Sequence, residues 1–421
     1  MFQTMEQCTD FIFRLKASQY KGEPLQSACI ILNALGNPQK KTKFIHFAGS
    51  NGKGSTLNAT REILIAHGLT VGAFISPHLE RANERVTINK QQISDADFLR
   101  IANLLARVIA DKLGGKFPSF FEFVTLLALV YFSEQNLDVA LLETGIGGRL
   151  DSTNVIIPEV SVITTISLEH TEMLGDTHAR IASEKAGIIK AGKPVVVGVK
   201  NEEALAVIKE TAQQLQAPIY TLNEQFFAKP HQALFDYLGE MELRNVELAM
   251  FGEHQIANAA LAITATKLFL QELDEVKIRE ALKKAKWEGR FEWVRPNIVL
   301  DGAHNSEGTT ALIETLQQVV PNKQYVFVYA ALQDKDHALS IQLMDQIASE
   351  IHFTQIDLPR AATAAQLFAQ SHHQQKFANE NWIALLEQKM EQITADEVLV
   401  ITGSLYFIAE VRSYFVSKGW V

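Results

Sequence analysis

The residues best suited to chemistry form a glycine-rich segment, Gly49-Ser50-Asn51-Gly52-Lys53-Gly54-Ser55-Thr56. An apolar run from Phe44 to Ala48 precedes it, and a segment with helical periodicity follows it. Glycines allow backbone N–H groups to close around phosphate oxygens, the helix N-terminus adds its positive dipole end, and a lysine supplies a mobile charge. A hydroxyl at Ser55 suits Mg²⁺. The segment therefore predicts a nucleotide-phosphate site made of Asn51, Gly52, Lys53, Gly54 and Ser55.

The spacing of this loop departs from the common GxxxxGK[ST] pattern. Phe47 stands where the first glycine would be, and Gly54 separates Lys53 from Ser55. The alternative is a glycine turn that joins a strand to a helix and binds nothing. Because strand, lysine, hydroxyl and helix follow one another in the order that phosphate binding requires, nucleotide binding is the better interpretation.

A carboxylate and an imidazole follow two other predicted strands. The run Val139 to Leu142 leads into Glu143 and a glycine-containing loop, and the run Val160 to Ile166 leads into Ser167-Leu168-Glu169-His170. Ligands of open α/β sheets bind at the carboxyl ends of the strands, so Glu143 and His170 could share a metal. Mg²⁺ prefers oxygen ligands, and one histidine among them is unusual. A loop glutamate and a hydrogen-bonded histidine stay open as the alternative from these residues alone.

The composition argues against several classes of protein. The chain has 421 residues, with 48 acidic and 39 basic side chains and a net charge of −9, so it lacks the broad basic footprint of a duplex-binding protein. Its two cysteines, Cys8 and Cys29, have neither metal-binding nor disulfide-framework spacing, which fits a reducing compartment. The N-terminus has no signal-peptide pattern, and no stretch reaches about 20 apolar residues. We expect a soluble cytoplasmic protein of two or three domains, without nucleic-acid or membrane partners.

Apolar runs alternate with helix-period segments along most of the chain, which indicates an α/β fold with helices on both faces of a parallel sheet. In the first part we expect strands at Phe44 to Ala48, Val139 to Glu143, Val160 to Ile166 and Pro194 to Val199, and helices at Ser55 to His67, Phe98 to Leu113, Phe120 to Phe132 and Asn201 to Leu215. After Arg295-Pro296 we expect strands at Ile298 to Asp301, Tyr325 to Ala330, His352 to Ile356 and Glu397 to Thr402, and helices at Ser306 to Val319, Leu339 to Ile351 and Asn379 to Ile393. Residues 221–251 have the pattern of a hairpin insert before a helix at His254 to Leu270. The predicted domains are residues 1–295 and 296–421.

Seven segments together resemble folylpolyglutamate synthases, including their bifunctional dihydrofolate synthase relatives. They are GSNGKGS at 49–55, SPHL at 76–79, LLETGIGGRLDSTNV at 141–155, SLEHTEMLGDT at 167–177, EKAGIIK at 184–190, DGAHN at 301–305 and ITGSLY at 401–406. More distantly, the layout is similar to that of the Mur ligases. The resemblance implies an N-terminal P-loop-type ATPase domain with a mostly parallel sheet and a C-terminal Rossmann-like α/β domain.

The same resemblance implies an activity. It is that of an ATP-dependent ligase that adds L-glutamate in γ-linkage to tetrahydrofolate through an acyl phosphate. The implied partners are small molecules, namely ATP, a reduced folate and L-glutamate, and the implied state is a monomer. A second activity in the same site, joining glutamate to dihydropteroate, stays open.

The resemblance also implies two Mg²⁺ sites. Their ligands would be Ser55, Ser76, Glu143 and His170, together with Lys185. In the family the lysine is carbamylated on its side-chain nitrogen, which turns a cation into an anionic oxygen ligand. Apart from the resemblance, Lys185 is a helical lysine beside Glu184, and such a side chain is most often solvated.

Further residues match nucleotide contacts of the family. Asn258 and Arg290 correspond to its nucleotide-contacting asparagine and phosphate-contacting arginine, and Asp301 and His304 belong to a loop that contacts ATP from the second domain. The resemblance thus makes Lys53, Glu143, His170, Lys185 and Arg290 the catalytic set. On its own, Asp301 ends an apolar strand, a place that favours a ligand edge. Arg290 could equally form a salt bridge between domains.

The pterin-binding segments of the bifunctional members match Ser119-Phe120-Phe121-Glu122 and Leu150-Asp151-Ser152. Aromatic rings suit a flat heterocycle because they stack on it. The alternative is that Phe120, Phe121 and Phe123 form helix core, and we expect this of at least two of the three.

Three other functions compete with the folate ligase. A nucleotide-driven switch needs only the phosphate loop and leaves the Glu143, His170 and Lys185 cluster and the second domain unexplained. A pure binding module gives no reason for a glutamate and a histidine to converge on bound phosphates. A Mur-type amino-acid ligase is the nearest enzymatic rival, and a UDP-sugar substrate would distinguish it.

Overall fold

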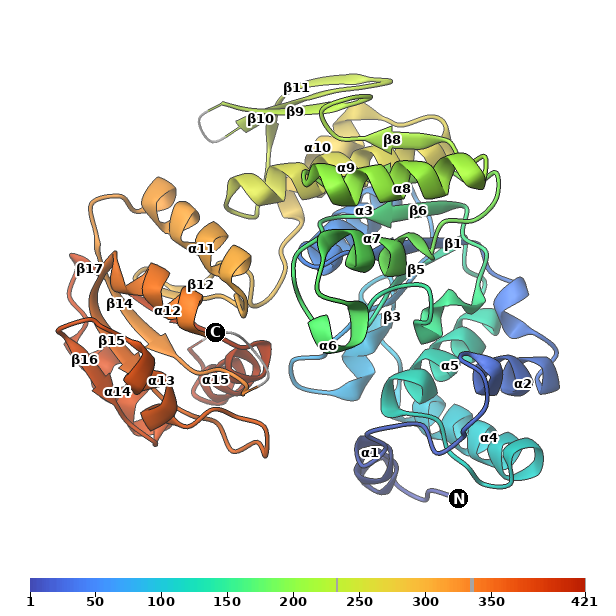
Figure 1. Cartoon of the computed structure of the whole chain (residues 1–421), viewed down its shortest axis with the longest axis horizontal. Helices are drawn as coiled ribbons and strands as arrows, with labels where there is room; N and C mark the ends of the chain where they lie inside the picture. Colours follow the sequence, from blue (N-terminus) through green and yellow to red (C-terminus); the bar gives the residue numbers. More distant parts are fainter. Residues whose placement is uncertain (232–233, 334–336, 421) are drawn as a thin grey trace. The chain divides into compact units, whose positions relative to one another are not determined.

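The computed structural model describes residues 1–231, 234–333 and 337–420, and these divide into two compact units, each with mixed helices and strands (Figure 1). Unit 1 comprises Met1–Ala249 and Gln255–Ala285, and unit 2 comprises Met250–His254 and the chain from Lys286 onward. Unit 2 therefore starts before the boundary expected at Arg295-Pro296. The reason is that Glu292–Arg295 pairs with Ile298–Leu300 and so belongs to the second sheet.

Unit 1 is built on a sheet whose described strands lie in the order β4-β3-β2-β5-β1-β6-β7-β8. They are β1 (Phe44–Ala48), β2 (Val71–Phe74), β3 (Val86–Ile88), β4 (Gln91–Gln92), β5 (Val139–Glu143), β6 (Val160–Ile163), β7 (Val195–Val197) and β8 (Ile219–Thr221). From β2 to β8 the neighbouring strands run parallel, and β3 and β4 form an antiparallel edge. The carboxyl ends of β2, β5, β1 and β6 therefore meet at one edge of the sheet.

Helices supply the crossovers that parallel strands require. The helices assigned mainly to unit 1 are α1 (Met5–Phe13), α2 (Gln26–Ala34), α3 (Lys53–Ala66), α4 (Asp95–Leu113), α5 (Phe120–Ser133), α6 (Thr171–Leu174), α7 (His178–Ala186), α8 (Glu202–Gln214), α9 (Glu253–Leu270) and α10 (Glu275–Lys284). Ser94, Ser119 and Asn201 cap α4, α5 and α8 by accepting a hydrogen bond from the N–H three residues on. Such caps are typical helix starts.

Both faces of the central strands are buried. Phe44 packs into the core beneath α1, α2, α4 and α5, whereas Ile45 and Phe47 pack into the opposite core beneath α3, α9 and α10. A further cluster beneath α7 and α8 takes Ala48 and Ile163. Because each strand faces two cores, β1 and β5 are nearly unbroken apolar runs.

The expected hairpin insert contains a third strand. Within the described part of residues 221–251, an antiparallel sheet has the order β11-β10-β9, with β9 at Phe227–His231, β10 at Leu234–Leu238 and β11 at Glu242–Glu247. Phe235 and Tyr237 of β10 are buried in the core beneath α9. Residues 232–233 lie outside the described residues.

Unit 2 has its own sheet, whose described strands lie in the order β12-β13-β17-β14-β15-β16 with β12 alone antiparallel. The strands are β12 (Glu292–Arg295), β13 (Ile298–Leu300), β14 (Gln324–Tyr329), β15 (Ala348–Phe353), β16 (Lys376–Ala378) and β17 (Glu397–Thr402). The helices are α11 (Ser306–Val319), α12 (Ala338–Asp345), α13 (Ala364–Gln370), α14 (Trp382–Gln392) and α15 (Leu405–Ser417). This confirms a second α/β domain.

One predicted helix is wrong in its second half. We expected Leu339 to Ile351 to be helical, but α12 ends at Asp345 and Ala348–Phe353 forms β15. Ile351 and Phe353, two residues apart, both face the core, and the backbone pairs with β14. No helix among the described residues is long and apolar enough to span a membrane.

Candidate active site

The glycine loop joins the carboxyl end of β1 to the N-terminus of α3, as predicted. Gly52 has a φ of 84°, which residues with a Cβ rarely adopt. Ser50 N donates to Thr165 O at 2.8 Å, and Asn51 N donates to Thr165 Oγ1 at 2.9 Å. Thr164 Oγ1 donates to Asn51 O at 2.6 Å. The segment that follows β6 therefore holds the loop in shape.

Asn258 of α9 lies against this loop. A Cβ at Gly52 would come within 2.4 Å of Asn258 Oδ1. The same amide accepts a hydrogen bond from Thr56 Oγ1 at 3.3 Å and donates one to Gln255 Oε1 at 3.0 Å. The structure thus brings Asn258, a residue assigned by resemblance alone, to the phosphate loop.

We expect Gly52→Ala to weaken ADP binding by about tenfold or more, the equivalent of one charge-assisted hydrogen bond to a phosphate. Its methyl group would displace Asn258 or the loop, in addition to the strain of a positive φ. Gly68→Ala is the matched control, because Gly68 has a φ of 89° and no atom within 4 Å of the added Cβ. Both variants should lose about 1–2 kcal/mol in the free energy of unfolding from the backbone alone. Calorimetric titration with ADP checks this, and an equal loss of affinity in both variants would contradict it.

Two lysines converge on the carbonyl oxygen of Gly49. Lys53 Nζ donates to it at 2.7 Å and Lys185 Nζ at 2.9 Å. Lys185, which lies in α7, also pairs with Glu169 at 3.0 Å, and these side chains are only 2% and 9% exposed. The structure therefore places Lys185 beside the phosphate loop and not on the solvated face of a helix.

Burial and neighbouring charges shift the pKa values in this cluster. Burial lowers the pKa of Lys185 to about 8, with Glu169 opposing the shift and Lys53 adding to it. Burial by itself raises the pKa of Glu169. The positive charges of Lys185 and Lys53 and the hydrogen bonds from Lys185 and Ser50 outweigh this effect, so the pKa falls to about 2. Glu169 is therefore a carboxylate at neutral pH, and Lys185 loses its proton far more readily than an exposed lysine.

Acid should destabilise the protein partly through Glu169. A carboxyl group whose pKa is about 2 when folded and near 4.5 when unfolded stabilises the fold above pH 4.5 and loses that contribution as the pH falls toward 2. We expect Glu169→Gln to remove up to about 3 kcal/mol of this pH-dependent stability. Urea unfolding between pH 6 and pH 3 measures it, with Glu159→Gln as a control because Glu159 forms a more exposed pair with Lys193. Parallel pH profiles for wild type and Glu169→Gln would refute the expectation.

The predicted metal ligands Ser76 and Glu143 lie together. Glu143 ends β5 and Ser76 follows the neighbouring strand β2, so that Ser76 N donates to Glu143 Oε2 at 3.0 Å. Glu143 and Ser55 are buried, and His170 precedes the short helix α6 with a φ of 48°. Among the described residues no group of three or more His, Cys, Asp and Glu side chains could hold a metal. A cation here would need hydroxyl, water or phosphate oxygens besides Glu143, which are donors that Mg²⁺ prefers.

Three predicted nucleotide contacts gather within unit 2. Asp301 follows β13, and its two oxygens accept hydrogen bonds from Ala303 N and Phe291 N, both at 2.8 Å. Burial raises the pKa of Asp301, and Arg290 opposes this shift. Arg290 Nη1 and His304 Nδ1 both donate to Gly302 O, at 3.4 and 2.9 Å. The structure thus brings Arg290, Asp301 and His304 together.

The first predicted substrate segment begins α5. Ser119 caps this helix by accepting a hydrogen bond from Glu122 N at 3.3 Å. Glu122 is buried and accepts a hydrogen bond from Ser27 Oγ at 2.5 Å, and burial raises its pKa. Ser119 and Glu122 therefore both have structural partners within unit 1.

The aromatic rings of this segment differ in burial. Phe123 is fully buried, whereas Phe120 and Phe121 are half-buried and pack against the same core. The Arg85 guanidinium lies 4.9 Å from the centre of the Phe120 ring, and His78 packs edge-on to it. We expected at least two of the three rings to be helix core, but only Phe123 is fully buried, whereas Phe120 and Phe121 keep exposed surface.

The second substrate segment follows β5. Gly145 lies against the Phe121 ring, because a Cβ there would meet that ring at 2.8 Å. Leu150 is 46% exposed, Asp151 is 6% exposed, and Ser152 begins a short 3-10 turn, Ser152–Val155. Phe121 of the first predicted segment and Asp151 of the second therefore both contact Gly145, which belongs to neither segment.

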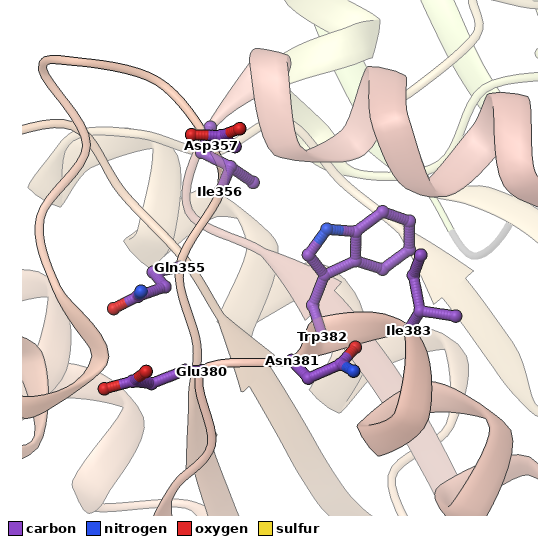
Figure 2. Close-up of a pocket in the computed structure, with 7 residues that line it drawn as sticks. All are labelled: Gln355, Ile356, Asp357, Glu380, Asn381, Trp382 and Ile383. Atoms are coloured by element: carbon purple, nitrogen blue, oxygen red, sulfur yellow. The ribbon is translucent and has the colours of Figure 1, made fainter.

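A separate open pocket of about 440 Å³ lies within unit 2 (Figure 2). It is lined by residues 355–357, which follow β15, and by residues 380–383 at the start of α14. Trp382 forms part of its wall. None of the predicted site residues lines it.

Sequence reasoning missed several residues of the site. Glu169 is adjacent to His170 in the chain, but its contact with Lys185 depends on where α7 packs. Thr164 and Thr165 hold the loop through bonds between segments that are more than 100 residues apart in the chain. A single sequence carries no local signal for these pairings.

Comparison with known proteins supports the same family. Residues 47–266 match the Mur ligase middle domain, and residues 289–405 match the family described as Mur ligase, glutamate ligase domain. The chain is 38% identical over 404 residues to the dihydrofolate synthase/folylpolyglutamate synthase of Bacillus subtilis (strain 168), which covers 91% of this chain and 92% of that protein.

Solved structures of proteins from this family have a similar fold. The fold is similar to that of Escherichia coli FolC in complex with DHPP and ADP, with a TM-score of 0.92 and 27% identity over 99% of both chains. It is also similar to the bifunctional folylpolyglutamate synthase/dihydrofolate synthase of Yersinia pestis complexed with AMPPNP and Mn ion, with a TM-score of 0.90 and 31% identity over 98% of both chains. The chain therefore belongs to the folylpolyglutamate synthase/dihydrofolate synthase family, whose two domains are those of the Mur ligases.

Proposed function

We propose that this protein is an ATP-dependent ligase that joins L-glutamate in γ-linkage to tetrahydrofolate through an acyl phosphate. The observation that carries the proposal is the convergence of Lys53, Lys185 and the Glu169 carboxylate on the Gly49 end of a phosphate loop. A nucleotide switch would need the loop but not the buried lysine–carboxylate pair behind it.

The nucleotide is held, in this proposal, by Asn51, Gly52, Lys53, Gly54, Ser55 and Asn258, and by Arg290, Asp301 and His304 of unit 2. Backbone N–H groups and the N-terminus of α3 bind the phosphates. Lys53 now donates to carbonyl oxygens of its own loop, and bound phosphates offer it stronger, charged acceptors.

Divalent cations fit the donors at the sheet edge. Ser55, Ser76, Glu143, His170 and Lys185 would hold two Mg²⁺ ions, which neutralise the charge that phosphoryl oxygens gain during transfer. Glu143 supplies a buried carboxylate, and Ser76 fixes its orientation through the backbone bond at 3.0 Å. The solved relative complexed with AMPPNP and Mn ion supports binding of a divalent cation as well as a nucleotide.

Lys185 is proposed to be carbamylated. The neutral amine attacks carbon dioxide, an N–C bond forms, and a proton leaves to solvent, which leaves an anionic carbamate. A pKa of about 8 makes the neutral amine available near neutral pH. The anionic product would lie beside Glu169, so the carbamate is stable only where cations balance both charges.

Amide formation then needs little covalent chemistry from the protein. The substrate carboxylate takes the γ-phosphoryl group of ATP, the glutamate amine attacks the resulting acyl phosphate, phosphate leaves, and the ammonium proton passes to solvent. Lys53 and Arg290 stabilise the oxygens that gain charge, while binding positions the two reactants.

The folate end is proposed to bind at Ser119, Phe120, Phe121, Glu122, Leu150, Asp151 and Ser152. The partly exposed rings of Phe120 and Phe121 suit stacking on a pterin. The relative from Bacillus subtilis is named for both activities, and the FolC structure contains DHPP, which favours dihydropteroate as a second substrate.

Acceptor-dependent ATP turnover tests the proposal. ADP release should require both a folate substrate and L-glutamate, and omission of either should reduce it to background. ATP hydrolysis without an amino acid would favour the nucleotide switch. Turnover with a UDP-sugar precursor in place of a folate would favour a Mur-type ligase.

A further inference from the structure

His46 is a buried histidine in the middle of β1 that the proposed chemistry does not use. It is 0% exposed and stands between Leu142 of β5 and Ser161 of β6 in the sheet register. Burial lowers its pKa to about 3, and Lys190 adds to this shift, so the ring is neutral at physiological pH. A neutral imidazole has one N–H donor and one bare nitrogen.

A chain of hydrogen bonds leads from this ring to the loop after β5. His46 Nε2 lies 2.7 Å from Thr153 Oγ1, and Thr153 Oγ1 lies 2.5 Å from Asp151 Oδ1. Thr153 N donates to the same carboxylate oxygen at 2.9 Å. The other oxygen, Asp151 Oδ2, accepts from Gly145 N at 2.8 Å and from Ile146 N at 3.1 Å. The carboxylate therefore ties both ends of the loop together.

The donor and the acceptor in each of these hydrogen bonds follow from counting protons. The Thr153 hydroxyl has one proton, so it donates to one neighbour and accepts from the other. If it donates to Asp151, then His46 donates from Nε2, and bare Nδ1 is the ring atom without a partner among the described residues. The reverse direction requires a protonated Asp151 and leaves a buried N–H of His46 without an acceptor. Orphaned buried N–H groups are rarer than orphaned acceptors, so His46 is the donor.

We propose that His46 is a positioning residue for the folate substrate, acting through Thr153 and Asp151 on the segment 145–152. This inference rests on the proposed function, because that segment carries the proposed substrate residues Leu150, Asp151 and Ser152.

The effect should extend to the aromatic part of the same site. The amide of Gly145 is one of the groups that Asp151 holds, and the Phe121 ring packs directly on Gly145. A shift of Gly145 would therefore move Phe121 as well as the loop. Both proposed substrate segments depend on the same carboxylate.

The phosphate loop is held by a different set of bonds. Ser50 and Asn51 are fixed by Thr164 and Thr165, and none of these bonds involves Asp151 or Thr153. Loss of the His46 bond should consequently act on the folate and not on the nucleotide. A merely structural histidine would affect both substrates alike.

Amide hydrogen exchange of the unliganded protein tests the coupling without any assay of activity. His46→Phe removes the donor, and we expect faster exchange at the amides of Gly145, Ile146 and Thr153. His46→Gln places an amide N–H at about the reach of Nε2 and should restore slow exchange. Ser161→Ala is the matched control, because Ser161 is buried at the same level of the sheet and its hydroxyl donates to Ile188 O at 3.0 Å. Unchanged exchange in His46→Phe, or equal changes in Ser161→Ala, would overturn the inference.

Steady-state kinetics test the proposed effect of His46 on folate binding. His46→Phe should raise KM for tetrahydrofolate by about tenfold, the worth of one buried hydrogen bond, with KM for ATP nearly unchanged and His46→Gln close to wild type. Thr153→Val, a milder isosteric change, should give the same pattern, and the double variant should be no worse than either single one. Equal increases in both KM values, or additive effects, would overturn the inference. A wild-type protein without glutamyl product would instead remove the proposed function, and hydrogen exchange would still decide the coupling.

Discussion

Replacement of Lys185 by methionine is expected to lower turnover by about 10²-fold or more while ADP affinity changes far less. Methionine keeps the buried aliphatic stem of the lysine but has no amine to be carbamylated. The variant also removes the ion-pair partner of Glu169, which is only 9% exposed and keeps a hydrogen bond from Ser50 and the charge of Lys53, so the loss of stability should be at most about 3–5 kcal/mol. His170→Ala should show the same loss of turnover without that loss of stability. Initial rates, ADP titration and urea unfolding measure the three quantities.

A double variant separates chemistry from folding. Lys185→Met/Glu169→Gln removes both charges of the pair and should regain much of the stability lost in Lys185→Met, because a neutral pair needs no compensation. Its turnover should stay low. Wild type incubated with isotope-labelled bicarbonate should show a carbamate signal in the carbon spectrum that both variants lack. Wild-type turnover in either variant would remove Lys185 from the mechanism.

Replacement of Lys53 by methionine is expected to lower kcat/KM for ATP by about 10²–10³-fold. Within the described part of the chain, Lys53 Nζ donates to Gly49 O and Ser50 O, at 2.7 and 3.2 Å, and the side chain is partly exposed, so water can replace it there. The free energy of unfolding should therefore change by less than about 1 kcal/mol. The effect on rate is larger because a positive charge aimed at phosphate oxygens is lost.

Lys193→Met is the matched control for Lys53→Met. Lys193 pairs with Glu159 at 2.7 Å, and their side chains are 33% and 40% exposed. Such pairs contribute about 0–1 kcal/mol, so both rate and stability should stay near wild type. An active Lys53→Met protein with ordinary ATP dependence would contradict the assignment of the phosphate loop.

Several strands that are buried on both faces were predictable from the sequence, but β2 (Val71–Phe74), which is also fully buried, was not predicted. The bounds of β1, β5, β17 and α11 agree with those expected, because unbroken apolar runs mark the strands and Asn305 caps α11 through a bond from Gly308 N at 2.7 Å. The edge strand β4 was not predicted, because Gln91–Gln92 is exposed and polar and pairs only through its backbone. The stretch 339–351 was misjudged because its apolar spacing suits a helix and a strand alike.

Within the site, residues at strand ends were predictable and long-range partners were not. Glu143 ends β5, and the loop after β1 leads to Lys53 and Ser55 at the start of α3, so the rule for the carboxyl edge of a sheet predicts that they lie near one another. Lys185, Asn258 and Arg290 came from the family resemblance, because a lone lysine, asparagine or arginine has no chemical signature of its own. Glu169 and His46 depend on packing between distant segments, which only the folded chain reveals.

Mass spectrometry of the reaction products tests the central claim most directly. The protein is incubated with MgATP and L-glutamate, with tetrahydrofolate in one reaction and dihydropteroate in another. The proposed function predicts that tetrahydrofolate grows by glutamyl units, and growth of dihydropteroate as well would make the enzyme bifunctional. No glutamyl product from either substrate would contradict the claim.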